Sequence, residues 1–300
     1  MLGYVRFIGT AALAALALAM LLPFHLVAVR IGGPRSMKVA QLWQRFACFL
    51  IGIRVNVTGT PVADRPLLLL SNHSTWLDIP VLASVAPVSF VAKSEVATWP
   101  VVSFLARAQR TVFVDRKNRH ATGTHADEVA GRLSKGDIIV LFAEGTSSDG
   151  NRVLPFRSAL VGAAQRAIEG DGAATVQPVA IAYRRMQGLP LGRQHRPHVA
   201  WYGGTDLLPH LRRVLSEGGI DVEVVFGPAR RLSAKDNRKA VTQEAGALVR
   251  RLVAALNAGR DPREVLEGKD GMIATSEDGA IPLEGKREDE SSVGKAATHS

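Results

Sequence analysis

The chain contains the run Pro66-Leu-Leu-Leu-Leu-Ser71, which continues directly into Asn72-His73-Ser74-Thr75-Trp76-Leu77-Asp78. Four consecutive leucines without polar alternation are typical of a strand that is buried on both faces of a sheet. In α/β proteins, ligand sites gather at the carboxyl ends of such strands. We therefore expect His73 to lie at the carboxyl end of a central strand, next to a functional site.

The spacing of His73 and Asp78 favours a general base. If residues 74–80 begin a helical turn, Asp78 comes back beneath His73. A carboxylate in that place holds the proton of one ring nitrogen and leaves the other nitrogen free to deprotonate an alcohol. A histidine followed five positions later by an aspartate also arises by chance, because the chain has 8 histidines in 300 residues. The spacing therefore needs support from other segments.

Short apolar runs rich in β-formers alternate with helical stretches between residues 55 and 258. Strands are expected at residues 66–71, 88–93, 111–115, 137–142, 176–183 and 221–226. Helices are expected at residues 96–108, 121–133, 158–168 and 234–256, the last with Ser233 as its N-cap. Strand–helix alternation of this kind predicts a layered α/β domain.

The two ends of the chain differ from this central part. Residues 7–29 contain no Asp, Glu, Lys or Arg, and a helix of that length crosses about 30 Å of hydrocarbon. Pro23 and His25 interrupt its last turns, so a helix lying in one leaflet stays open, as does a cleaved signal peptide. Residues 39–53 predict a second helix on the membrane or on the domain. We expect a membrane anchor over 1–34, a folded domain over 35–258 and a disordered acidic tail over 259–300.

Charge and cysteine content narrow the class of protein. The chain carries a net charge of +10, and its last 40 residues hold ten acids and five bases, so the folded part is more basic than the total. Basic residues follow the apolar run more often than they precede it, which places the main domain on the cytoplasmic side of a membrane. A single cysteine excludes a disulfide framework and a Cys-rich zinc site. Neither a P-loop nor a G-x-S-x-G motif is present.

Three further segments support the His73 motif. Thr111-Val-Phe-Val-Asp-Arg116 is a strand ending in a cation, Leu141-Phe-Ala-Glu-Gly-Thr-Ser-Ser148 is a strand ending in a carboxylate and a glycine turn, and Val176-Gln-Pro-Val-Ala-Ile181 is a strand with an early proline. In order and spacing, these segments and residues 72–78 resemble the four blocks of the glycerolipid acyltransferase family, the lysophosphatidate acyltransferase-like enzymes. The resemblance implies an acyltransferase domain with a mixed central sheet and flanking helices, which the N-terminal membrane-associated helix expected from residues 7–29 would precede. We expect no metal or other cofactor.

The resemblance also implies a role for each matching residue. His73 corresponds to the general base that deprotonates the acceptor hydroxyl as it attacks an acyl thioester, and Asp78 to the residue that orients this histidine. No covalent enzyme intermediate forms in that scheme. The fourth block, around Pro178, is associated with the acyl donor, which is acyl-carrier protein or acyl-coenzyme A. The residues expected to bind substrate are Asn72, Lys93, Arg116, Glu144, Gly145 and Thr146.

One departure from the family pattern bears on the acceptor. The third block commonly has Arg where this chain has Ser147, and a guanidinium suits a phosphate better than a hydroxyl does. The loop then adds Asp149, which suits a cationic head group. Residues 146–160 resemble a bacterial branch of the family that acylates lyso-ornithine lipid, whose acceptor has no phosphate. We therefore expect lyso-ornithine lipid as the acceptor, at the cytoplasmic face of the inner membrane.

Two other functions stay open on the sequence. The nearer one is a 1-acyl-glycerol-3-phosphate acyltransferase that forms phosphatidic acid, with Arg116 and Lys93 sharing the phosphate. The more distant one is a membrane-tethered basic binding module, since basic patches bind phosphate backbones. Aromatic residues make up only 6% of the chain and do not alternate with the basic ones, which argues against a nucleic-acid partner. The basic surface also suits anionic membrane lipid.

Overall fold

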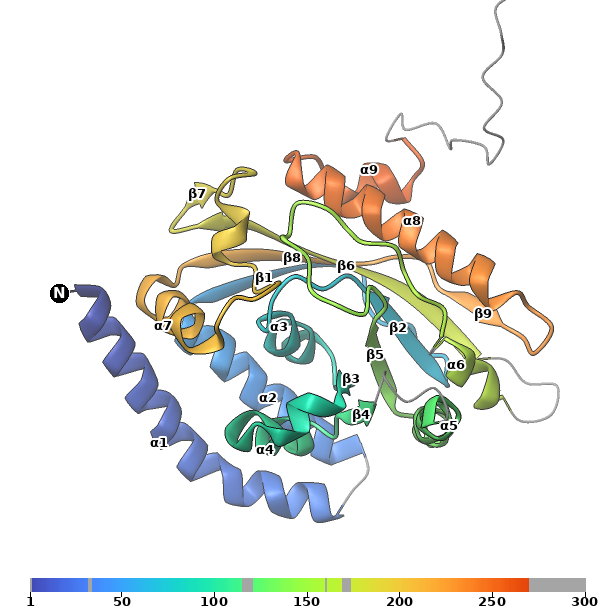
Figure 1. Cartoon of the computed structure of the whole chain (residues 1–300), viewed down its shortest axis with the longest axis horizontal. Coiled ribbons are helices and arrows are strands. Elements are labelled where there is room, and N and C mark those ends of the chain that lie inside the picture. Colours follow the sequence, from blue (N-terminus) through green and yellow to red (C-terminus); the bar gives the residue numbers. More distant parts are fainter. Residues whose placement is uncertain (1, 32–33, 115–120, 160, 169–173, 270–300) are drawn as a thin grey trace, which may run out of the picture. The chain divides into compact units, whose positions relative to one another are not determined.

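A nine-stranded mixed sheet is the centre of the computed structural model, which describes residues 2–31, 34–114, 121–159, 161–168 and 174–269 (Figure 1). The strands are Ile53–Thr58 (β1), Leu67–Ser71 (β2), Val88–Lys93 (β3), Val112–Val114 (β4), Ile138–Phe142 (β5), Ala174–Met186 (β6), Leu189–Pro190 (β7), Ile220–Phe226 (β8) and Arg230–Leu232 (β9). Their order is β1-β8-β6-β2-β5-β3-β4, with β7 and β9 paired to β6. Strands β6, β2, β5, β3 and β4 run parallel, whereas β8 is antiparallel to β6. The predicted mixed α/β sheet is confirmed.

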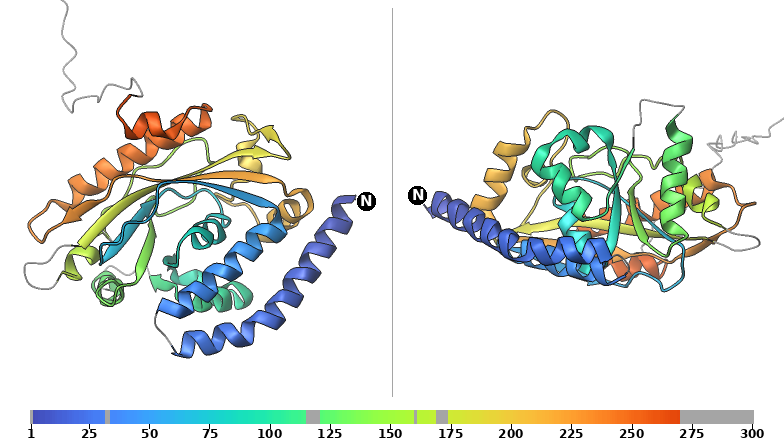
Figure 2. Two further views of the ribbon diagram at one scale, coloured as in Figure 1. Left: turned by 180° about the vertical axis from the view of Figure 1, so that it is seen from behind. Right: turned by 90° about the horizontal axis from the view of Figure 1, so that it is seen from below.

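Strand β2 lies in the middle of the core, and its four leucines are each at most 1% exposed. The helices that flank the sheet include Pro34–Ile51 (α2), Asp78–Val85 (α3), Ala121–Leu133 (α5), Gly162–Arg166 (α6), Leu207–Glu217 (α7) and Arg238–Asn257 (α8). Successive strand side chains point to opposite faces, so Leu67 and Leu69 pack with α2, α3 and α7. Leu68 and Leu70 pack with α5, α6 and α8. Figure 2 shows α2 and α8 on opposite sides of the sheet, which is why this strand has no polar face.

Helix α1, Leu2–Ile31, contains the charge-free stretch and packs against α2 and α7. Arg6 fixes its start, because its guanidinium donates hydrogen bonds to the carbonyl oxygens of Leu215 (2.8 Å) and Ile51 (2.7 Å). A cation at the carboxyl ends of α7 and α2 also interacts favourably with both helix dipoles. Judged by length, hydropathy and charge together, no helix in the described part of the chain qualifies as a membrane span. The expected transmembrane helix is therefore not found there.

The helix predicted over residues 96–108 is divided into a 3₁₀ turn, Ser94–Thr98 (η1), and helix α4, Pro100–Ala108. The residue before a proline is biased towards extended backbone, and Trp99 has φ −88° and ψ 110°. Proline is favoured at the first position of a helix because its missing N–H needs no partner there. Pro100 therefore starts α4 instead of lying inside a longer helix.

The N-cap predicted for the last long helix is wrong. Helix α8 begins at Arg238, and the side chain of Asn237 accepts hydrogen bonds from the backbone N–H groups of Lys239 and Ala240. Ser233 instead donates its hydroxyl to the Asp236 carboxylate at 2.6 Å within the preceding turn. Asparagine and serine are both good N-caps, so composition alone did not distinguish them.

Several elements extend beyond the expected set. Strand β1 and helix α7 were not expected, and neither was the short 3₁₀ turn Arg196–His198 (η2). Helix α9, Pro262–Leu266, follows α8 and buries Val265. The segment that we expected to be disordered from residue 259 onwards therefore begins with an ordered helix. Residues 270–300 lie outside the described part of the chain.

Candidate active site

The predicted site residues follow the ends of neighbouring parallel strands. His73 lies two residues after β2, Glu144 two residues after β5, and Lys93 is the last residue of β3. Since β2, β5 and β3 are parallel neighbours, their carboxyl ends meet at one edge of the sheet, where ligand sites of α/β proteins form. Strand β4 ends at the same edge with Val114. Arg116 follows two positions later in the sequence and is outside the described residues.

The structure brings His73 and Asp78 into direct contact. Nδ1 of His73 lies 2.8 Å from Oδ2 of Asp78. The same oxygen accepts the backbone N–H groups of Ser74 (2.7 Å) and Thr75 (3.1 Å). These three bonds fold the loop back on itself, because Asp78 is also the first residue of helix α3. The turn expected between His73 and Asp78 is thus present.

The tautomer of His73 follows from these contacts. An ionised carboxylate only accepts hydrogen bonds, and backbone N–H groups already point at Asp78, so we assign the proton to Nδ1 of His73. Nε2 is then an acceptor, and no described residue bonds to it. The His73 side chain is 18% exposed, whereas that of Asp78 is fully buried. The pair therefore presents one basic nitrogen to the edge of the sheet.

The imidazole and the backbone of His73 are both held in place. Its ring stacks on Phe142, with centroids 4.0 Å apart and planes inclined by 16°. Its N–H donates to Oε1 of Glu144 at 2.8 Å, and its carbonyl oxygen accepts the N–H of Ser148 at 2.9 Å. The loop after β5 thus bonds to both the N–H and the carbonyl oxygen of His73. This limits the conformational freedom that a reacting group would otherwise lose in the transition state.

Glu144 is buried and bridges two loops. Its Oε1 accepts from His73, and its Oε2 accepts the N–H of Leu154 at 2.9 Å. Burial raises the pKa of Glu144 to about 7, although both backbone hydrogen bonds oppose the rise; the negative charge of Asp78 adds to it. The Glu144 side chain therefore holds the backbone of His73 and of Leu154 in place. The two residues after it, which were also predicted to bind substrate, are more accessible: Gly145 is partly exposed and Thr146 is exposed.

The buried Glu144 carboxyl predicts a pH-dependent stability. Its pKa is higher in the folded chain than the ordinary value of 4.5, so the folded state binds more protons than the unfolded state between these values. We expect the contribution of Glu144 to the free energy of unfolding to fall by roughly 3 kcal/mol as the pH rises from 4 to 8. Urea unfolding of Glu144→Gln should lack this contribution to the pH dependence that the parent shows. The exposed Glu217→Gln serves as the control, and equal slopes in the parent and Glu144→Gln would contradict the assignment.

Asn72 and Lys93 occupy different surroundings. The carboxamide of Asn72 is buried, donating to the carbonyl oxygen of Ile181 and accepting the Ile181 N–H, both at 2.9 Å. Lys93 is exposed, and its side chain makes no hydrogen bond to another described residue. Substrate contacts by these two residues stay predictions, and the geometry of Asn72 favours a role in fixing the loop to β6.

The loop expected to meet the acceptor head group is braced internally. Oδ1 of Asp149 accepts the N–H of Asn151 at 3.0 Å, and the Asn151 side chain bonds to Asp149 and to Arg196. Burial alone would raise the pKa of Asp149, but the bonds from Asn151 and the charge of Arg152 outweigh it and lower the pKa. The Asp149 carboxylate is thus already engaged within its own loop, and Ser147 lies partly exposed beside it.

Tyr183 is a site residue that sequence reasoning missed. Its hydroxyl donates a hydrogen bond of 2.8 Å to Oδ1 of Asp78, 105 positions away in the chain. Tyr183 belongs to the expected strand over 176–183, but no local motif connects it with Asp78. Only the pairing of β6 with β2 could have indicated the contact.

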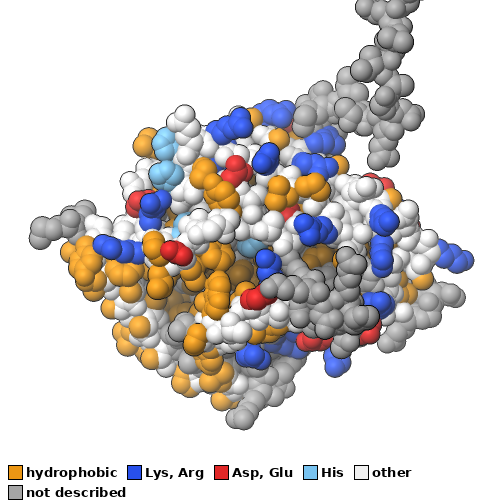
Figure 3. Space-filling model, in the orientation of Figure 1, with side chains coloured by type: hydrophobic (Ala, Val, Ile, Leu, Met, Phe, Trp, Pro, Cys, Tyr) orange, Lys and Arg blue, Asp and Glu red, His pale blue; other side chains and the backbone are white. Residues whose placement is uncertain are grey.

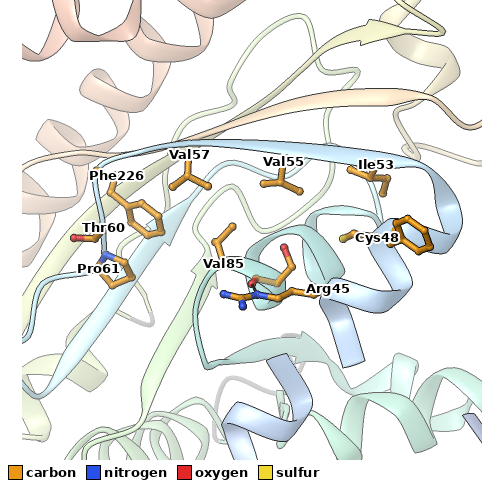
Figure 4. A pocket seen from close by; sticks show the side chains of 12 residues that line it. Arg45, Cys48, Ile53, Val55, Val57, Thr60, Pro61, Val85 and Phe226 are labelled. Atoms are coloured by element: carbon orange, nitrogen blue, oxygen red, sulfur yellow. Dashed lines mark hydrogen bonds between the residues drawn. The ribbon is translucent and has the colours of Figure 1, made fainter. Parts of the chain in front are cut away.

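A cavity of about 380 Å³ lies apart from these residues, beneath β1 and beside α2 (Figure 4). Ile53, Val55 and Val57 point into it from β1, and Arg45 and Val85 line its other side. None of its lining residues belongs to the four motif segments. The predicted reacting groups, His73 and Asp78, therefore do not line this cavity.

Comparison with known proteins agrees with the geometry. A family model described as Acyltransferase matches residues 54–182. Two curated relatives are called lyso-ornithine lipid O-acyltransferase. The one from Brucella abortus (strain 2308) is 46% identical over 264 residues, covering 87% of this chain and 98% of the relative. The one from Rhizobium meliloti (strain 1021) is 47% identical over 220 residues, covering 73% and 75%.

One relative with another name is less similar to this chain than these two are. A 1-acyl-sn-glycerol-3-phosphate acyltransferase from Neisseria gonorrhoeae is 32% identical over 206 residues, covering 68% of this chain and 75% of the relative. The crystal structure of the 1-acyl-sn-glycerophosphate (LPA) acyltransferase PlsC from Thermotoga maritima has the same fold, with a TM-score of 0.59 at 20% identity over 85% of this chain and 96% of that one. With motif order, fold and near full-length similarity in agreement, the chain belongs to the glycerolipid acyltransferase family and is an acyltransferase.

Proposed function

We propose that this enzyme transfers a fatty acyl group from an acyl thioester to the hydroxyl of lyso-ornithine lipid, with His73 as general base and Asp78 orienting it. The observation that carries the chemistry is the buried, fully bonded Asp78 beneath Nδ1 of His73. The similarity of 46–47% to two relatives of that name supports the acceptor. No cofactor takes part in the proposed reaction.

The chemistry follows from the free nitrogen of His73. Nε2 accepts the proton of the acceptor hydroxyl as its oxygen attacks the thioester carbonyl carbon. A C–O bond forms, and the tetrahedral intermediate then collapses with cleavage of the C–S bond. The imidazolium returns the proton to the departing sulfur, so His73 ends the cycle neutral. The Asp78 carboxylate stabilises the transient imidazolium and keeps its proton on Nδ1.

The head group is proposed to bind at the edge formed by the loops after β3, β4 and β5. Lys93 and Arg116 suit an acceptor carboxylate as well as a phosphate. Ser147 stands where a phosphate-binding relative would commonly offer a guanidinium. Gly145 and Thr146 complete the acceptor side, and an acyl-carrier protein or coenzyme A thioester is the donor.

Membrane association is proposed through the N-terminal helices. Within the described part of the chain, many apolar side chains of α1 are exposed, and Figure 3 shows hydrophobic side chains gathered over the region of α1 and α4. The hydrocarbon of a bilayer would remove this apolar surface from water, because a long stretch of α1 carries no charged residue. We place the enzyme on the cytoplasmic face of the inner membrane, with α1 in one leaflet. The exposed apolar residues of α1 are Tyr4, Val5, Ile8, Leu13, Leu16, Met20, Phe24, Leu26 and Val27.

The alternative acceptor is 1-acyl-glycerol-3-phosphate. It is favoured by the fold shared with the Thermotoga maritima enzyme and by the 32% identity to the Neisseria gonorrhoeae one. Both acceptors present a secondary hydroxyl to the same base, so the reacting groups do not distinguish them. Only the contacts with the head group do.

The acceptor test compares the two lysolipids directly. Membranes containing the expressed enzyme are given lyso-ornithine lipid or 1-acyl-glycerol-3-phosphate, each with labelled acyl-carrier protein. We expect kcat/KM to be at least about tenfold higher for lyso-ornithine lipid, a difference of roughly 1.4 kcal/mol. Ser147→Arg should narrow the ratio, because it adds a phosphate-binding guanidinium. Faster acylation of 1-acyl-glycerol-3-phosphate by the parent enzyme would refute the proposed acceptor while leaving the acyltransferase chemistry intact.

A further inference from the structure

The Asp78 carboxylate accepts hydrogen bonds from other groups besides His73, the residue that it is proposed to orient. Oδ2 accepts from Nδ1 of His73 and from the N–H groups of Ser74 and Thr75. Oδ1 accepts from the Tyr183 hydroxyl at 2.8 Å, which is its only donor among the described residues. Since Asp78 is fully buried, water does not replace a missing donor. Tyr183 therefore satisfies the side of Asp78 that faces away from His73.

The position of Tyr183 is fixed by the catalytic loop itself. The Asn72 carboxamide bonds to both backbone groups of Ile181, two residues earlier on β6. Side chains two residues apart on a strand share a face, so Ile181 and Tyr183 both pack into the core beneath α3. Tyr183 is also the last residue before an irregularity in the pairing of β6 with β8. Asn72 thus sets the register that places the phenol against Asp78.

We propose that Tyr183 is a positioning residue for acyl transfer, whose hydroxyl holds Oδ1 of Asp78 so that the carboxylate stays ionised while His73 is neutral and able to accept a proton. The proposal rests on the roles assigned above to His73 and Asp78. In the resting site all the donors to Asp78 are neutral, and together they take the place of solvent around a buried charge. His73 is then not forced to carry a compensating positive charge.

Loss of the phenol changes this balance in a predictable direction. With Oδ1 unsatisfied, the buried negative charge is best compensated by a protonated His73, so the imidazolium is favoured and the neutral base becomes scarcer at a given pH. Burial raises the pKa of Tyr183 well above its ordinary value and the charge of Asp78 adds to the rise, so the phenol remains a donor across the working range. Among the described residues, the other titratable groups near this cluster include the Glu144 carboxyl and the Cys48 thiol. The Arg196 side chain lines a small cavity together with Tyr183 and Ser74.

The test is Tyr183→Phe, which removes the hydroxyl and keeps the ring. We expect kcat at pH 7 to fall about 10- to 100-fold with KM nearly unchanged, and the acidic limb of the kcat–pH profile to move up by about one pH unit. Activity should therefore recover partly at higher pH. The control is Tyr202→Phe. The Tyr202 phenol lies on the protein surface and has no hydrogen bond to a described residue, so the kcat–pH profile of this variant should match that of the parent enzyme.

A second measurement separates the proposal from folding and from the proposed function. NMR titration of ¹³C-labelled histidine, with the His73 signal assigned by its loss in His73→Gln, should show a higher pKa for His73 in Tyr183→Phe. An unchanged kcat, or a loss of kcat that is equal at every pH with no change in the His73 titration, would overturn the positioning role. If Tyr183→Phe does not fold, the titration compares the parent with Asn72→Ala. Loss of the Asn72 carboxamide should release the Tyr183 phenol and raise the His73 pKa, and an unchanged pKa would overturn the proposal. Full activity in His73→Gln would instead refute the proposed function.

Discussion

Replacing His73 by alanine should reduce kcat for acyl transfer by about a thousandfold or more, because a positioned general base contributes about 10²–10⁴-fold to a rate. The acceptor is an alcohol, and an alcohol is a poor nucleophile until its proton is removed. No other described side chain presents a basic nitrogen beside Nε2 of His73, whose ring is fixed against Phe142. Single-turnover acylation of the lysolipid by purified enzyme in detergent micelles would measure the loss.

The control for this experiment is His195→Ala. His195 is exposed, and its ring centroid lies 5.7 Å from that of His198. Its removal should leave the rate within about twofold of the parent, the usual range for surface changes. Circular dichroism and sedimentation with lipid vesicles should show that His73→Ala still folds and binds membranes. A variant that folds and retains a tenth or more of the activity would remove His73 from the role of base.

Asp78→Asn should cost both activity and stability. The amide is neutral, so it does not stabilise an imidazolium. Its NH₂ group would face either the donors that now bond to Oδ2 or the Tyr183 hydroxyl that now donates to Oδ1. A comparable change in a serine-hydrolase triad lowers kcat by about 10⁴-fold through the wrong tautomer. We expect a loss of about 10²–10⁴-fold in kcat with a smaller change in KM, and a lower melting temperature because buried donors lose their acceptor.

Asp206→Asn provides the matched control. Asp206 is exposed and its side chain makes no capping bond to α7, so this variant should keep the melting temperature and the rate of the parent. A kcat for Asp78→Asn within about threefold of the parent, measured on protein that is shown to be folded, would mean that His73 does not depend on this carboxylate.

Local sequence patterns predicted most of the sheet. The run of four leucines indicated β2 correctly because a strand covered on both faces needs no polar side, and the structure covers it on both faces. Strand β1 was missed because it lies at the edge of the sheet, where several of its residues are exposed. Its partner β8 lies more than 160 residues away, and no local pattern carries that information.

The site was predictable only as far as it is local. His73 and Asp78 are five residues apart, and the turn between them could be inferred from their spacing. Tyr183 and Ile181 approach the same loop from β6, more than 100 residues later, so their roles depend on strand pairing. Glu144 was predicted as a substrate ligand from the family block, and its bonds to backbone N–H groups became visible only in three dimensions.

The central position of β6 has a consequence for the order in which the protein can become active during synthesis. Strands β2 and β5, which precede His73 and Glu144, leave the ribosome before β6, which supplies the Ile181 and Tyr183 contacts to the loop after β2. Strand β1 must wait still longer, because its pairing partner in the sheet is β8. Contacts that are distant in sequence form slowly, and exposed strand edges invite aggregation meanwhile. A nascent chain that ends before residue 174 therefore carries the motif of an acyltransferase without its working site.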